Sequence, residues 1–329
     1  MVEEAGKWPY HFPASKNFPK RHERGSVKGA LLVSDRYVNQ TLMPASSAWI
    51  GLASPGKEGS WQTESKGYQF WAHSDHRGRF RIKSIREGNY SLYAWVPGFI
   101  GDYKYDHNLT IAPGCRIDLG LLVYKPPRNG PTLWEIGVPD RTAAEFFLPE
   151  PNPKLSNRLF QHDNINKFRK YGLWERYTDL YPDHDLVYTI GVSNYQKDWF
   201  FAQVPRLIRN MTHHRTTWLV IFFLEYVHQE GTCTLQLALA SATLSELQVR
   251  FNNPDLRSHP RFTTKLIGRD NVIARHGIHG LYWLFTVQVH GSWLRHGNNT
   301  LFLTQSRDSS PFQGIMYDYI RFKGPRGAD

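Results

Sequence analysis

Between Val27 and Tyr124 the chain alternates apolar and polar residues with a period of two. Gly, Pro, Asn and Asp separate the alternating segments, and no stretch there has a helical period. A period of two is the pattern of a strand, whose successive side chains point to opposite faces. Strands are expected near residues 27–33, 46–53, 67–72, 78–83, 89–95, 107–111 and 117–124. Short strands at this spacing predict a β-sandwich.

Within this region, one stretch has a continuous strand, turn and strand pattern: GRFRIKSIREGNYSLYAWVPG, residues 78–98. Its turn falls at Glu87, Gly88 and Asn89, so the pattern predicts an ordinary β-hairpin. Aromatic residues that alternate along strands usually pack in a core. We therefore expect these rings to be buried, and we assign no ligand to them.

A second pattern begins after Pro126 and Pro127, which stiffen the chain. In residues 163–180, apolar residues return at helical spacing and predict a short irregular helical region. Strands are expected again near residues 187–191, 199–204, 216–227, 232–241, 245–252, 282–290, 299–305 and 314–323. Eight strands with long connections predict a jelly roll, which makes the whole chain all-β.

Composition narrows the class of partner. The length of 329 residues suits two domains, and the net charge is +11. A basic surface suits a polyanion: nucleic acid, an anionic membrane or an acidic polysaccharide. Aromatic residues form 14% of the chain and include 11 Trp. That share is typical of all-β proteins and of sugar-binding surfaces, where a flat ring lies against the apolar face of a pyranose.

Few signals bear on the cellular compartment. No signal peptide is expected, because residues 1–25 have no apolar stretch followed by a cleavage site, and the longest apolar run, residues 218–224, is far shorter than a bilayer span. Cys115 and Cys233 fall in different halves, so no disulfide within a domain is expected. Sequons compatible with secretion begin at Asn39, Asn89, Asn108, Asn210 and Asn298. Residues 1–25, broken by Pro and Gly, are interpreted as a linker from a missing upstream domain.

The chain contains seven long and unusual motifs. The first three are GSWQTESKGYQFW (59–71), YAWVPGFIGDYKYD (93–106) and PPRNGPTLWEIGVPDRTAAEFF (126–147). The others are YGLWERYTDLYPDHDLVYTIGVSNYQKDWFFAQV (171–204), LALASATLSELQVRFN (237–252), IARHGIHGLYWLF (273–285) and PFQGIMYDYIRFKGP (311–325). Together they resemble the plant rhamnogalacturonan lyases of polysaccharide lyase family 4, and the resemblance covers nearly the whole chain.

The resemblance implies a domain plan. The family has a catalytic β-domain, a fibronectin III-like sandwich and a carbohydrate-binding-module-like jelly roll, and this chain resembles only the last two. We expect the sandwich at residues 26–125 and the jelly roll at 126–329, after the linker. Residues 128–147 resemble the entry into the third domain, where the first strand of the jelly roll starts. Their aromatic rings are expected to pack the interface, and Asp140 and Arg141 to form a local pair.

The implied function is that of an accessory portion of a rhamnogalacturonan endolyase, which cleaves rhamnogalacturonan I by β-elimination. That reaction needs a base at C5 of galacturonate and positive charge to stabilise the developing anion. In the family these roles belong to residues of the N-terminal domain, so we assign no catalytic residue, metal or cofactor here. A stand-alone polysaccharide-binding protein without lyase activity is the alternative hypothesis.

Two clusters combine cationic and aromatic side chains, which suits a polymer of rhamnose and galacturonate. The first holds Arg275, His276 and His279, close to Tyr282 and Trp283. The second holds Trp174 and Arg176, beside Tyr177. The alternative for the histidines is a solvated surface loop, and a metal site is weakly indicated because His-x-x-His lacks further spaced ligands.

The expected partner is therefore an acidic pectic polysaccharide, rhamnogalacturonan I. Nucleic acid is not expected because the basic residues are dispersed along the chain. No membrane partner and no oligomer are expected, and the resemblance implies an extracellular, cell-wall setting.

Overall fold

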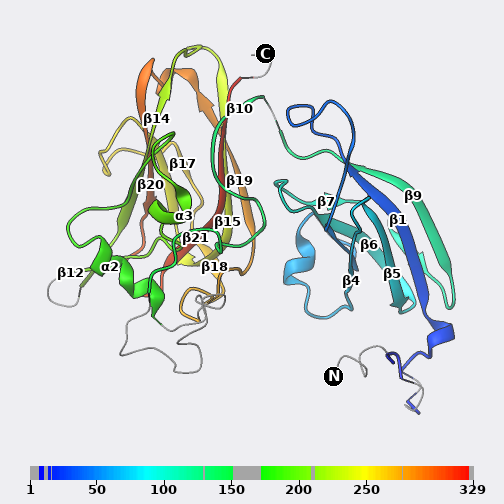
Figure 1. Ribbon diagram of the computed structural model, residues 1–329. Coiled ribbons are helices and arrows are strands. Elements are labelled where there is room, and N and C mark those ends of the chain that lie inside the picture. The colour runs from blue at the N-terminus through cyan, green and yellow to red at the C-terminus, as the bar shows by residue number, and fades with distance from the viewer. Residues whose placement is uncertain are drawn as a thin grey trace. The chain divides into compact units, whose positions relative to one another are not determined.

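The computed structural model describes residues 7–10, 14–15, 17–128, 130–150, 172–208, 212–275 and 277–325. The chain divides into two compact units, Met1–Arg128 and Asn129–Asp329 (Figure 1). Each unit has its own apolar core, formed by the strands of two sheets. The all-β prediction is confirmed, whereas the finer division into residues 1–25, 26–125 and 126–329 stays a prediction.

The first unit holds a four-stranded and a five-stranded sheet. In the four-stranded sheet, β1 (Gly25–Val33) pairs with β2 (Met43–Pro44), β5 (Arg79–Ile85) and, in parallel, β9 (Arg116–Tyr124). In the other, the order is β4 (Phe70–His73), β3 (Trp49–Ala53), β6 (Gly88–Trp95) and β7 (Tyr103–Lys104), and β8 (Leu109–Ile111) also pairs with β6. Alternation explains the core, because Val27, Leu31 and Val33 of β1 are all buried.

The predicted hairpin at residues 78–98 is wrong. The strands β5 and β6 form where expected, but β5 pairs with β1 and β6 pairs with β3, so the turn crosses from one sheet to the other. Ser84 and Gly88 both have positive φ values, 57° and 146°, at this corner. Local alternation locates a strand but does not name its partner, and here the partners are distant in sequence.

The described part of the N-terminal segment contacts the first unit. Its 3₁₀ helix η1 (Arg21–Glu23) leads into β1. Arg24 is buried, lies with its Cζ 4.6 Å from the ring centre of Trp8, and donates from Nη1 to the Ser84 carbonyl at 3.1 Å. The segment expected to be a linker therefore packs on the sandwich through these contacts of Arg24.

The second unit holds two five-stranded sheets, seen edge-on in Figure 1. In one, β10 (Thr132–Gly137), β21 (Gly314–Lys323) and β15 (Thr232–Ser245) are neighbours, and β15 also pairs with β18 (Ile267–Arg269) and β19 (Trp283–His290). The other has the order β11 (Val187–Thr189), β14 (Thr216–Leu224), β20 (Gly297–Gln305), β16 (Leu247–Phe251) and β17 (Phe262–Thr263). A separate short pair joins β12 (Arg206–Ile208) to β13 (Thr212–His214).

Short helices interrupt this sandwich: η5 (Leu173–Glu175), α2 (Arg176–Leu180), α3 (Tyr195–Asp198) and η7 (Gly291–Trp293). The helices η5 and α2 lie in the region predicted to be helical, whose residues 163–171 lie outside the described part of the chain. Residues 199–204 do not form the predicted strand; they make only isolated bridges, Phe147 to Phe200 and Gln203 to Ile315.

The core of the second unit is unusually aromatic. Trp199 and Trp218 meet edge to face with ring centres 5.1 Å apart, and Tyr317 lies 5.3 Å from Trp199. Gln203 is fully buried beside them: its side-chain amide donates to the carbonyls of Thr216 and Leu303, and its Oε1 accepts from Tyr317. A buried amide must find such partners because leaving it unpaired costs about 1–3 kcal/mol.

Two further expectations concern the cysteines and the apolar stretches of the chain. Cys115 and Cys233 are both free thiols. Among the residues that the structure describes, no helix has the length and apolar character needed to cross a bilayer.

Two glycines with the same backbone conformation provide a test of the packing. Gly268 has φ +83° and its added Cβ would lie 2.0 Å from the Ala242 carbonyl oxygen, whereas Gly191 has φ +81° and open space. We expect Gly191→Ala to cost about 1–2 kcal/mol from the left-handed conformation alone. Gly268→Ala should cost about 3 kcal/mol or more, because the backbone must also move. Urea unfolding followed by Trp fluorescence measures both, and equal losses would contradict this packing.

Candidate functional site

A pocket of about 400 Å³ opens on the second unit. Its walls come from η5 and α2, from the β12–β13 pair, and from the turn before β21. Thr178, Leu207 and Pro311 contribute to these walls. The side chains with binding chemistry that line it are Trp174, Glu175, Arg176, Asp179, His213 and Phe312. Trp174 and Arg176, predicted from the sequence, thus share a pocket, while His213 and Phe312 were not predicted.

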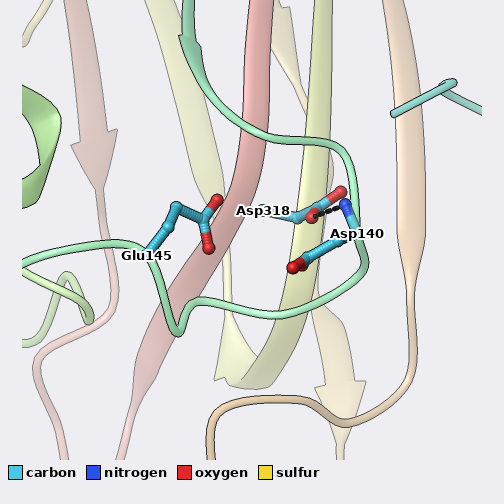
Figure 2. Close-up of side chains that lie close together, drawn as sticks. All are labelled: Asp140, Glu145 and Asp318. Carbon is cyan, nitrogen blue, oxygen red and sulfur yellow. Dashed lines mark hydrogen bonds between the residues drawn. The ribbon is translucent and has the colours of Figure 1, made fainter. Parts of the chain in front are cut away.

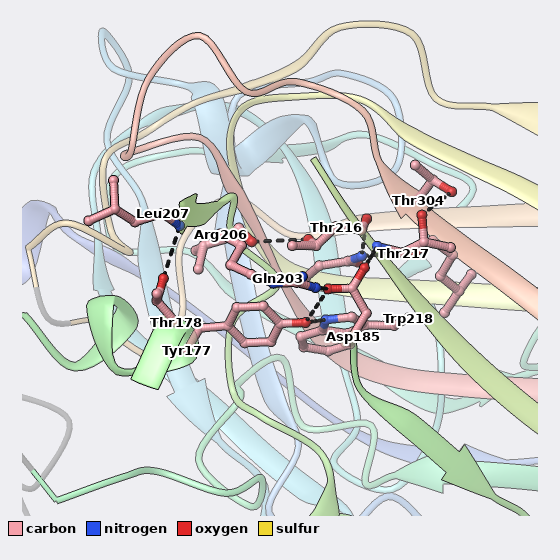
Figure 3. A network of polar contacts seen from close by, with 12 residues as sticks. Tyr177, Thr178, Asp185, Gln203, Arg206, Leu207, Thr216, Thr217, Trp218 and Thr304 are labelled. Atoms are coloured by element: carbon pink, nitrogen blue, oxygen red, sulfur yellow. Dashed lines mark hydrogen bonds and ion pairs between the residues drawn. The ribbon is translucent and has the colours of Figure 1, made fainter. Parts of the chain in front are cut away.

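A polar network fixes the helix that forms one wall (Figure 3). Tyr177 is fully buried; its hydroxyl donates to Asp185 Oδ1 at 3.1 Å and accepts from the indole N–H of Trp218 at 2.8 Å. Asp185 also pairs with Arg206 and accepts from the main-chain N–H of Thr217. These contacts join α2 to β12 and β14. Tyr177 is therefore a structural anchor and not an accessible ring of the expected cluster.

The aromatic groups of the pocket differ in exposure. Trp174 is only 5% exposed and meets Phe312 edge to face at 5.6 Å, whereas Phe312 is 44% exposed. Gln313 fixes this turn by accepting from the Ser310 main-chain N–H and donating to the Leu244 carbonyl. The ring open to a ligand is thus Phe312, and Trp174 supports it from behind.

The charges of the pocket have both signs. Arg176 is partly exposed, and its Nε lies 3.4 Å from Asp179 Oδ2. Burial raises the pKa of Glu175, which lies beside it on the pocket wall. A partly exposed guanidinium beside an exposed ring can bind a sugar carboxylate while the ring covers an apolar sugar face.

The other predicted cluster is not part of this pocket. Arg275 and His279 are exposed and are absent from its lining, and His276 lies outside the described residues. Tyr282 is covered on one face by Arg141, whose Cζ lies 4.3 Å from the ring centre. Trp283 and Phe285 lie parallel, with 3° between their planes. The role of Arg275, His276 and His279 in binding stays a prediction.

A second constellation joins residues from both ends of this unit: Asp140, Glu145 and Asp318 (Figure 2). Their carboxylate oxygens lie within 4.8 Å of one another. Asp318 stands on β21 and is fully buried, and Asp140 and Glu145 lie on the segment that follows β10. Burial raises the pKa of Asp318 to about 7 and that of Glu145 to about 8. Oxygen-only groups of this kind could hold a hard cation.

This cluster was missed in the sequence. Asp140 and Glu145 lie in the stretch expected to contain a local Asp140–Arg141 pair, but there the main-chain N–H groups of both Asp140 and Arg141 donate to Asp318 Oδ1, at 3.0 and 2.7 Å. The aromatic rings of that stretch pack inside the second unit, where Trp134 stacks on Phe322. An available signal was Asp318 itself, a lone carboxylate in the otherwise apolar run IMYDYI.

Comparison with known protein families shows to which family the chain belongs. Residues 132–322 match the description "CBM-like: Polysaccharide lyase family 4, domain III", and residues 45–119 match "Polysaccharide lyase family 4, domain II". The chain belongs to polysaccharide lyase family 4. Its two units correspond to the fibronectin III-like and carbohydrate-binding-module-like domains of this family.

Relatives within family 4 are similar over much of the chain. A "Rhamnogalacturonate lyase" of Dickeya dadantii is 25% identical over 96% of this chain and 46% of its own length. A "Probable rhamnogalacturonate lyase B" of Aspergillus niger is 26% identical over 73% of this chain and 36% of its own length. The chain thus spans less than half the length of these curated relatives. They are bacterial and fungal, so the plant affinity stays a prediction.

Solved structures add little. A putative carbohydrate binding protein from Pseudomonas aeruginosa matches 32% of this chain and 91% of its own length at 12% identity. Its TM-score of 0.21 is too low to describe the fold of this family 4 chain.

The anchor of the pocket helix can be tested by removing one oxygen. Tyr177→Phe leaves the buried indole N–H of Trp218 without its acceptor and takes a donor from Asp185. We expect the free energy of unfolding to fall by about 2 kcal/mol. The matched control is Tyr226→Phe, because Tyr226 is 78% exposed. Urea titration compares the two; an unchanged midpoint for Tyr177→Phe would show that the network does not stabilise the helix.

Proposed function

We propose that the chain is the accessory portion of a rhamnogalacturonan lyase and that it binds an acidic pectic polysaccharide. The observation that carries this is the match to domains II and III of family 4, together with relatives named rhamnogalacturonate lyases. In such a protein the chain holds the polymer, and the elimination itself takes place on another domain. The setting is extracellular, as the substrate class requires.

The pocket beside Phe312 is the proposed binding site. The exposed Phe312 ring offers an apolar face to a sugar, Arg176 provides a cationic group for a carboxylate, and the His213 imidazole adds a polar group to the lining of the same pocket. The loop at Arg275 and His279 is a second candidate surface, exposed and cationic. The net charge of +11 favours approach of a polyanion to either surface.

Binding is measured by isothermal titration of rhamnogalacturonan I oligosaccharides into the full chain. Phe312→Ala should weaken binding about tenfold, corresponding to ~1.4 kcal/mol of lost ring contact. Arg176→Ala should weaken binding and reduce its dependence on salt, since exposed charges are screened over about 10 Å at 0.1 M. Arg275→Ala, measured alongside, shows whether the second surface contributes.

Matched controls use side chains outside the pocket. Phe223 is 58% exposed on β14, and Arg257 is exposed and paired with Asp255, as Arg176 is with Asp179. Phe223→Ala and Arg257→Ala should leave affinity unchanged. Full affinity in both pocket variants would remove this pocket as the binding site, and no binding at low salt would remove polysaccharide binding by the chain.

The division of labour predicts that the purified chain releases no unsaturated uronate from rhamnogalacturonan I. Ultraviolet absorbance detects the double bond that β-elimination creates. A rise in absorbance that disappears in a His279→Ala variant would place catalysis on this chain and overturn the accessory role. A chain that binds but never improves degradation when added to an active lyase would favour the alternative, a stand-alone binding protein.

A further inference from the structure

We propose that Arg24 and Arg86 of the first unit form a second binding site of the chain, which takes the carboxylate of a uronic acid sugar. This site lies on the N-terminal segment and on the corner between β5 and β6, and it shares no residue with the pocket at Phe312. Only the choice of polymer rests on the proposed function. The site itself follows from two guanidinium groups that have no carboxylate partner.

The side chain of Arg24 carries a charge although it is almost completely buried. It is 8% exposed, and it donates from Nε to the Pro19 carbonyl at 2.9 Å and from Nη1 to the Ser84 carbonyl at 3.1 Å. In the described part of the chain Nη2 has no hydrogen-bond acceptor, and it is not one of the unsatisfied atoms that are shut off from solvent. Buried charges are normally paired, so this accessible N–H group suits an anion from outside.

A second guanidinium adds to the positive charge. Arg86 is partly exposed, and its Nη2 donates to the Asn17 carbonyl at 2.9 Å. Burial and the Arg86 charge both lower the pKa of Arg24, so the two arginines repel each other across a short distance. Neither has a carboxylate within ion-pair distance among the residues that the structure describes. Two neighbouring cations without a counter-charge attract an anion.

Aromatic rings lie against both guanidinium groups. Arg24 Cζ is 4.6 Å from the ring centre of Trp8 and 5.3 Å from that of Phe18. Arg86 Cζ is 4.2 Å from the ring centre of Tyr68. Trp8 is still 43% exposed and Tyr68 is 57% exposed, so both rings keep accessible surface. A uronate uses both features, because its carboxylate pairs with a guanidinium and its apolar face packs on a ring.

The fold fixes the corner that carries Arg86. The buried Tyr90 donates its hydroxyl to the main-chain carbonyl of Arg86 at 3.2 Å, and Arg24 bonds to Ser84 two residues earlier. The guanidinium groups therefore come from two segments that already pack together. A carboxylate bound by both would add a further connection between the N-terminal segment and this corner.

The test titrates trigalacturonate into the full chain carrying Phe312→Ala and Arg176→Ala, so that the pocket on the second unit is disabled. One equivalent should bind, and binding should weaken as salt rises. Adding Arg86→Gln should lower the affinity about tenfold, because one of the two charges for the carboxylate is lost. Tyr68→Ala should also lower it, through loss of the ring. Both side chains are accessible, so neither change threatens folding.

The matched control is Arg36→Gln in the same background. Arg36 is exposed and lies over Tyr37 at 4.9 Å, as Arg86 lies over Tyr68, so this change should leave the affinity unchanged. A second measurement locates the ligand. The indole N–H signal of Trp8, assigned with Trp8→Phe, should shift in NMR spectra as trigalacturonate is added, and it should not shift with the neutral galactotriose.

Unchanged affinity in the Arg86→Gln variant, or an equal response to trigalacturonate and galactotriose, would overturn the site. Loss of all binding in the background of Phe312→Ala and Arg176→Ala would do the same, because the pocket would then be the whole binding site. Equal binding of inorganic phosphate would overturn the assignment to a uronate. These results leave the proposed function standing, which fails instead if the unsubstituted chain does not bind rhamnogalacturonan I at low salt.

Discussion

The arrangement of the second unit depends on one buried amide, that of Gln203. Its side chain reaches β14 and β20 of one sheet through the carbonyls of Thr216 and Leu303, and β21 of the other through Tyr317. Its main chain pairs with Ile315 as well. Every polar group of Gln203 is thereby satisfied in a core of aromatic rings, where an unpaired amide would be costly. Pro205, two residues further along the chain, lines the pocket, so the core contacts of Gln203 lie close in sequence to one of its walls.

The sequence predicted most of the strands because burial alternates along them. In β14, every second residue from Thr216 to Leu224 is buried, and the period of two is visible without a structure. The alternating pattern did not show which strands pair with one another or which apolar residues only fill the core. The pattern predicts a hairpin at the corner between β5 and β6, because the alternation on either side is the same whichever sheet a strand joins. Residues 199–204 are apolar because they fill the core, not because they extend a sheet.

The candidate sites also contain some residues that the sequence predicts and others that only the folded chain brings together. Trp174 and Arg176 could be found because they are neighbours in sequence and share one short helical region. Phe312 comes from a turn more than a hundred residues later, and only the folded chain brings it to Trp174. Asp318 likewise lies more than a hundred residues after Asp140 and Glu145 in the sequence. A lone carboxylate in a buried strand signals that something must satisfy it, but its partners are set by the packing of β10 against β21.

The parallel pairing of β1 with β9 has a mechanical consequence for the first unit. Ser26 lies opposite Arg116 and Val33 opposite Tyr124, so the chain enters at one end of this pair and leaves at the other. A pull on the two ends of the unit therefore runs along both strands in opposite senses and shears their hydrogen bonds together. Many bonds loaded at once resist far more than bonds opened one by one. A unit with this connection keeps its length when its two ends are pulled apart.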